Sequence, residues 1–174
     1  GCLKHVYGLF SMAHTPLAPH NPYEAGQIKG EFYGRVRPPA LNILDHIWVA
    51  HGSLCGYPAS TTTRRDMLVA GTDPVAMDAW SARHVLFPIS GDAAHDPDVP
   101  GYFRTYLTDA RETINSLGGL KGESVTFDAA EIDSVHHDQR EIQLRVLDVG
   151  QDIRLSWAGA APPYRIERDI HPSF

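Results

Sequence analysis

The sequence predicts an α/β fold, with a mixed sheet, flanking helices and a C-terminal β-hairpin. Three observations support this class. A short apolar run at residues 67–70 leads through a tight turn into an amphipathic helix. A second apolar run of similar length lies at 41–44. Apolar and polar residues alternate at 141–149 and again at 152–157, which is typical of a hairpin with one buried face.

The first part of the chain predicts two helices with a loop between them. The first helix has one apolar face, formed by Leu3, Val6, Tyr7 and Phe10. The second spans 24–36, and a smooth face is expected where its glycines recur, at Gly26, Gly30 and Gly34. The proline-rich stretch 14–23 is a loop, either a plain surface loop or an active-site loop that carries His14 and His20.

Two strands are predicted next, at 41–44 and 66–70, and an aspartate follows each, Asp45 and Asp73. If the strands are parallel neighbours, both carboxylates emerge at one sheet edge, where open α/β folds bind ligands. A further apolar run at 47–50 precedes a glycine-containing loop.

The turn after the second strand predicts the start of a helix. Gly71 ends the strand, Asp73 is placed to cap the helix, and Pro74 suits the first helical position because its missing N–H has no partner there anyway. The helix has an apolar stripe formed by Val75, Ala79, Ala82 and Leu86. Asp78 lies beside that stripe, so its carboxylate must find a partner or become protonated.

The rest of the chain predicts a loop, a long helix and β structure. A loop at 87–100 precedes the helix, whose apolar positions are Phe103, Tyr106, Leu107, Ala110, Ile114 and Leu117. Gly118 and Gly119 end it. A strand at 123–127, a polar turn at 136–138, the hairpin and a tail at 162–174 follow. Trp48 and Trp80 are both expected in the core.

Composition excludes several classes. The net charge is -6 with three lysines and no basic block, so nucleic acid is not an expected partner. No apolar run approaches the ~18 residues of a membrane helix. We expect a soluble protein, either cytoplasmic or exported. Cys2 and Cys55 are too few for a disulfide scaffold or a four-thiolate cluster.

No standard catalytic signature is present, so the candidate residues form a diffuse set. Asp45 and Lys4 are the candidate catalytic residues. Asp45 is chosen because strand ends host sites, and Lys4 is either an anion or phosphate clamp or a plain solvated lysine. Asp73 and His5 are candidate cofactor-binding residues, although a plain helix cap also explains Asp73. The candidate metal ligands are His46, His51 and Cys55. Imidazole with carboxylate suits Fe, Ni or Zn.

Two segments, GTDPVAMDAWSARHVLFP at 71–88 and LNILDHIWVAHG at 41–52, resemble the C-terminal half of the domain of unknown function family 362. Leu3-Lys4-His5 with Gly8 is similar to the family's Leu-Lys-Asn segment, with His5 in place of Asn. His51 stands where an acidic residue is expected. The resemblance covers roughly residues 1–120, which leaves 121–174 as a C-terminal β extension and tail of the same domain.

The resemblance implies one lobe of a larger two-lobe protein. The missing N-terminal segment, or a second protein chain, is the expected partner. Many relatives are described as iron–sulfur proteins, which implies a cluster held by a partner segment. The family is also similar to the nickel-dependent lactate racemase type of fold, where a cofactor lies between two lobes.

Two functional hypotheses follow. The first is a lobe or subunit of a metal- or cofactor-dependent enzyme, of redox or isomerase type, acting on a small molecule at the carboxyl edge of the strands. The second is a non-catalytic subunit that packs on a partner chain through the apolar face of residues 1–12.

Overall fold

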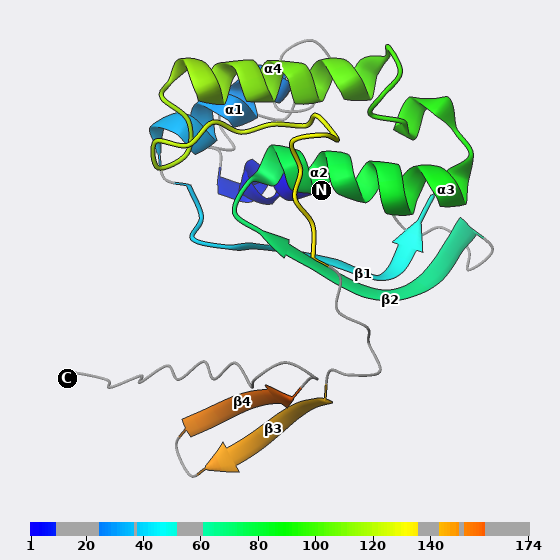
Figure 1. The fold of residues 1–174 in the computed structure, drawn as a ribbon, viewed down its shortest axis with the longest axis vertical. Coiled ribbons are helices and arrows are strands. Elements are labelled where there is room, and N and C mark those ends of the chain that lie inside the picture. The colour runs from blue at the N-terminus through cyan, green and yellow to red at the C-terminus, as the bar shows by residue number, and fades with distance from the viewer. Residues whose placement is uncertain (10–24, 37, 52–60, 136–142, 150–151, 159–174) are drawn as a thin grey trace. The chain divides into compact units, whose positions relative to one another are not determined.

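The computed structural model describes residues 1–9, 25–36, 38–51, 61–135, 143–149 and 152–158. They divide into two compact units, Gly1–Ile132 and Asp133–Phe174, which we describe separately (Figure 1).

The first unit is built in layers around one long helical segment. The 3-10 helix η1 (Cys2–Leu9) and helix α1 (Ala25–Arg35) precede strands β1 (Asn42–Ala50) and β2 (Thr62–Gly71). Then follow α2 (Pro74–Ser81), the π-helical η4 (Ala82–Leu86), α3 (Phe87–Ser90), the short η5 (Ala93–His95) and α4 (Tyr102–Ser116). The run from α2 to α3 is continuous and lies between the β1–β2 ribbon and the α1–α4 pair (Figure 1). The α/β class with flanking helices is therefore confirmed.

The two strands are antiparallel, so the parallel pairing expected from the sequence is wrong. Asn42 pairs with Gly71, Asp45 with Leu68 and Ala50 with Thr62, with an irregularity between His46 and Trp48. The physical reason is the connection: parallel strands need a crossover of a dozen or more residues, usually helical, and only 51–61 separates these two. The runs 41–44 and 47–50 form one strand around the irregularity.

The glycine face of α1 brings that helix close to α4. A Cβ on Gly30 would lie 2.8 Å from the Thr113 Cβ, and one on Gly34 would lie 2.8 Å from the Leu117 Cδ1. The prediction of a smooth face is thus confirmed. The core beneath this crossing includes Tyr33, Leu107, Ala110 and Ile114, all fully buried.

Two expectations about the core are corrected. Trp80 is buried as predicted, but Trp48 is 61% exposed. The apolar residues of η1 were expected to face a partner, yet Cys2, Leu3 and Val6 are buried within the unit itself. They pack there because α1 and α2 both contact η1.

The segment 123–127 is extended but forms no strand, so that prediction is wrong. Its backbone is held by side chains: Val125 N donates to Asn115 Oδ1 (2.8 Å), and Asn115 Nδ2 donates to the Val125 carbonyl (3.0 Å). Thr126 N donates to Asp73 Oδ2 (2.8 Å). The predicted loop at 87–100 is also corrected at its start, because α3 continues the preceding helix to Ser90.

The second unit contains an antiparallel hairpin, β3 (Gln143–Val149) with β4 (Asp152–Ala158), in which Val149 pairs with Asp152. The predicted hairpin is confirmed. The predicted polar turn at 136–138, the tail at 162–174 and the loop at 14–23 lie outside the described residues. Within the described part of the chain, no helix has both the length and the apolar character to cross a membrane.

Candidate functional site

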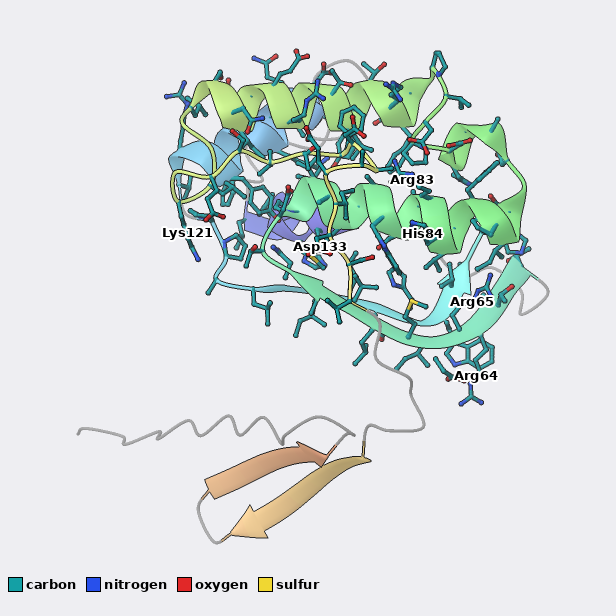
Figure 2. All side chains as sticks on the ribbon, in the orientation of Figure 1. Arg64, Arg65, Arg83, His84, Lys121 and Asp133 are labelled. Atoms are coloured by element: carbon teal, nitrogen blue, oxygen red, sulfur yellow. The ribbon has the colours of Figure 1, made fainter. Side chains whose placement is uncertain are left out.

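The side of the β1–β2 ribbon turned away from α2, here called the outer sheet face, exposes large apolar side chains. Alternation along each strand sends Leu44, Val49 and Val69 inward against the helices and their neighbours outward. The exposed large apolar side chains of the ribbon and of the residue before β1 are 39–65% exposed and comprise Leu41, Ile43, Ile47, Trp48 and Leu68. Figure 2 shows side chains projecting from this side of the ribbon, with Arg64 and Arg65 at its far end.

Charged groups also lie on the outer sheet face. Asp45 is exposed in the middle of β1, and its Oδ1 accepts a hydrogen bond from Ile47 N at 2.7 Å. The Arg64 guanidinium lies 5.8 Å from the Trp48 ring centre, and its Nε donates to Asp66 Oδ1 at 2.7 Å. The carboxylate of Asp45 therefore stabilises the strand irregularity and does not mark a strand end.

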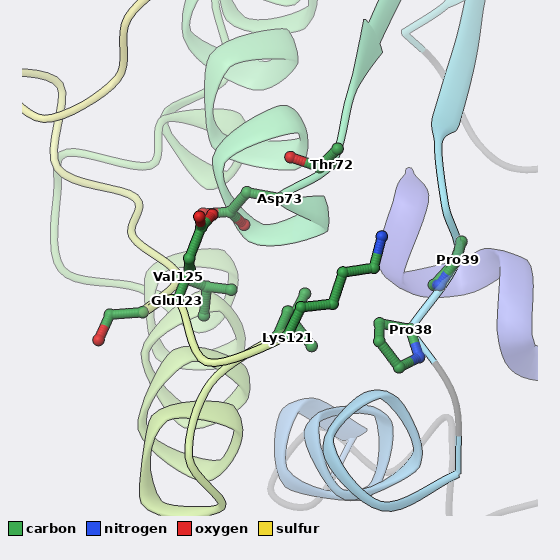
Figure 3. Close-up of a pocket in the computed structure, with 9 residues that line it drawn as sticks. Pro38, Pro39, Thr72, Asp73, Lys121, Glu123 and Val125 are labelled. Carbon is green, nitrogen blue, oxygen red and sulfur yellow. The ribbon is translucent and has the colours of Figure 1, made fainter.

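A pocket lies at the carboxyl end of β2, where the 38–39, 72–73 and 120–125 segments meet (Figure 3). Asp73 stands in its wall as the N-cap of α2, accepting hydrogen bonds from Val75 N (2.8 Å) and Ala76 N (2.9 Å). Burial raises the pKa of Asp73, although three backbone hydrogen bonds act in the opposite direction. The predicted helix cap is confirmed, and it sits beside a cavity.

A buried carboxylate holds the first turn of η1. Asp78 Oδ1 accepts from Cys2 N, and Oδ2 accepts from Leu3 N at 3.1 Å. Burial raises the pKa of Asp78, and the two backbone N–H groups lower it. Tyr33 from α1 donates its hydroxyl to the Cys2 carbonyl at 2.8 Å. Asp78 thus finds the partners that its position beside an apolar stripe demands.

Lys29 is the second buried charge of this region. Its side chain is 2% exposed, and Nζ lies 4.9 Å from the Tyr106 ring centre. Burial first, and then repulsion from Lys4, lower the pKa of Lys29 to about 8. The Tyr106 hydroxyl is also buried and has no hydrogen-bond partner among the described residues.

The site residues predicted from the sequence are distributed over separate parts of the unit. Lys4 and His5 are exposed on η1. His46 is half-buried next to Asp45 in β1, its Nδ1 lacks a partner in the described part of the chain, and burial lowers its pKa. His51 directly follows β1, while Cys55, His14 and His20 lie outside the described residues.

Among the described residues, no three His, Cys, Asp or Glu side chains gather in a way that could hold a metal ion. His46 and His51 therefore have no described third ligand.

Sequence reasoning placed Tyr106 on the apolar face of its helix but missed the buried Lys29 beside it. A signal for Lys29 was present: the buried face of α1 recurs at Ala25, Lys29 and Tyr33, which is helical i, i+4 spacing. A lysine on the apolar face of a helix is buried unless it reaches round to solvent.

The described residues form an α/β fold with exposed apolar side chains on its two-stranded ribbon. Residues 1–83 match the model of a family described as Domain of unknown function (DUF362). The matched stretch contains η1, α1, both strands and α2, and ends within η4. No curated protein and no solved structure gave a significant match.

Proposed function

We propose that the chain is a lobe or subunit that packs on a partner polypeptide through the outer sheet face. The observation that supports the proposal is a single surface with five exposed large apolar side chains, Leu41, Ile43, Ile47, Trp48 and Leu68. Apolar area removed from water contributes roughly 25 cal/mol per Å², so covering these side chains stabilises a complex. Monomeric proteins rarely expose contiguous apolar patches larger than a few hundred Å².

The sheet itself also favours a covering partner. A sheet of only two strands is marginal unless something packs on it. The inner face of β1–β2 has such support from Met77, Trp80 and Val85 of the helical segment. A partner on the outer sheet face would supply the second layer.

The charges on the face define the chemistry of the partner. A second copy of this chain is disfavoured, because a two-fold axis through the centre of the face would bring the two Asp45 carboxylates together. We therefore expect a different polypeptide, with an apolar docking surface and a basic side chain opposite Asp45. An acidic group on its rim would complement Arg64.

A photo-crosslinking residue at Ile43 in the full chain tests this proposal. The expected result is a crosslink to one defined surface of one polypeptide that co-purifies in stoichiometric amount. Leu68→Glu should abolish co-purification, whereas the matched control Val36→Glu should leave it intact. Both side chains are 65% exposed, but Val36 lies at the end of α1 and away from the sheet. Crosslinks to the chain itself, or a monomer with no crosslink, would overturn the proposal.

A second candidate is an enzyme lobe of redox or isomerase type that acts on a small molecule with the help of a cofactor held by a partner segment. The observation that favours it is Lys29, since a buried amine with a pKa of about 8 is suited to proton transfer near neutral pH. Elemental analysis of the co-purified complex for Fe, Ni and Zn tests the metal-dependent form. Metal at background level would exclude a metal-dependent enzyme and leave an enzyme with an organic cofactor as the second candidate.

A further inference from the structure

The pocket at the carboxyl end of β2 is separate from the outer sheet face. We propose that this pocket binds a small zwitterion of amino-acid size, with the ligand carboxylate on Lys121 and its ammonium on the side of Asp73. The inference does not depend on the docking proposal.

The size and lining of the pocket suit such a ligand. Its volume is about 130 Å³. One water needs roughly 10–15 Å³ of such space, so a molecule of several non-hydrogen atoms fits. The lining combines both signs of charge and two hydroxyls with an apolar wall, and comprises Pro38, Pro39, Thr72, Asp73, Leu120, Lys121, Glu123, Ser124 and Val125. Mixed charge of this kind suits a ligand that carries both charges better than one that carries a single charge.

Lys121 lies in the two-residue turn that joins Leu120 to Glu123. Its φ is +55°, in the left-handed region, between Gly119 at +77° and Gly122 at +86°. A residue with a Cβ is strained there, and such strain concentrates at ligand-binding sites. Glycine would fit the same turn without strain. In Figure 3 the Lys121 side chain extends across the pocket towards Pro39.

The opposite wall presents a fixed carboxylate. Both oxygens of Asp73 accept backbone hydrogen bonds, from Val75 and Ala76 on one side and from Thr126 on the other. The Asp73 carboxylate therefore cannot turn away from the pocket. These donors also satisfy the start of α2, so the helix N-terminus is not free to bind an anion, and Lys121 is the cation that remains in the lining.

Three small probes test the proposal by amide chemical shifts of the full chain. L-alanine carries both charges, acetate only the negative charge and ethylamine only the positive charge. Titration with alanine should change the amide chemical shifts of residues 72–73 and 120–125 until the site is saturated. The other two probes should bind at least about tenfold more weakly. Equal binding of acetate would indicate a plain anion site, and no saturation by alanine up to about 50 mM would exclude the site; either result overturns the proposal.

Variants of Lys121 separate binding from folding. Lys121→Arg should retain alanine binding. Lys121→Gly should weaken it by at least about tenfold while raising the unfolding midpoint, because the turn strain is removed. Arg65→Met removes a cation at the far end of β2 and should leave binding unchanged. Unchanged binding in Lys121→Gly would overturn the assignment of the carboxylate to Lys121.

Discussion

Lys29 Nζ lies 4.9 Å from the centre of the Tyr106 ring, and this contact joins α1 to α4 in the interior of the first unit. The ring face offsets part of the cost of burying the amine, typically by about 1 kcal/mol or more when water is excluded. The remaining cost appears as a pKa lowered to about 8.

Lys29→Met should therefore stabilise the chain at pH 7 by about 1–2 kcal/mol, because Met keeps the packing and removes the buried charge. The unfolded lysine titrates near 10.5 and the folded one near 8, so the unfolded state holds the proton more tightly. Wild-type stability must then rise relative to Lys29→Met as the pH is raised from 8 towards 10.5. Urea unfolding of both proteins at pH 7, 8 and 9 measures the difference between their free energies of unfolding. A difference that does not change with pH would contradict the lowered pKa of Lys29.

Asp78→Ala should destabilise the chain by roughly 2–4 kcal/mol, because the buried N–H groups of Cys2 and Leu3 lose their acceptor. Amide hydrogen exchange should show the loss first in η1. Asp92→Ala is a suitable control, since it removes a single exposed hydrogen bond to Ala94 N. Equal losses for the two variants would mean that Asp78 is not the group that holds η1.

Gly30→Ala should destabilise the chain by about 1–3 kcal/mol, although alanine favours a helix more than glycine does. The added Cβ would lie 2.9 Å from the Ala110 carbonyl oxygen and 2.8 Å from the Thr113 Cβ, so α1 and α4 must separate. Gln27→Ala, at an exposed position of the same helix, should change stability little. Thermal unfolding compares the stability of the two variants. A stabilised Gly30→Ala would show that α1 and α4 leave room for the added Cβ.

Arg83→Lys should destabilise the chain near neutral pH. Arg83 makes two 2.7 Å bonds to Asp98 and lowers the pKa of that carboxyl, a paired geometry that Lys cannot reproduce. A carboxyl with a lowered folded pKa stabilises the fold above its unfolded pKa near 3.8, and this stability is lost as the pH falls further. The difference between wild type and Arg83→Lys should thus be present at pH 6 and shrink below pH 4. Circular dichroism against pH checks this.

Elements with local signals were predictable from the sequence. The cap at Asp73, the proline after it and the glycine stop at Gly118 and Gly119 each depend on neighbours within a few residues. The repeat of glycine at every fourth position likewise indicated the contact face of α1 before the partner helix was known.

Features that depend on distant residues were not predictable. The pairing of β1 with β2 decides whether Asp45 lies at an edge or in mid-strand, and its antiparallel sense follows from the connection rather than from either strand. Residues 123–127 alternate like a strand, but their partners are the side chains of Asn115 and Asp73. The pocket combines three segments far apart in the chain, so Lys121 carried no local signal of it.

The bond between Leu3 N and Asp78 also has a kinetic consequence. The two residues are 75 positions apart, so the bond closes a very long loop. During synthesis, the first turn of the chain cannot reach its native environment until α2 has left the ribosome. Contacts of such large sequence separation slow folding, so η1 should dock late, after the local α2–α3 segment has formed.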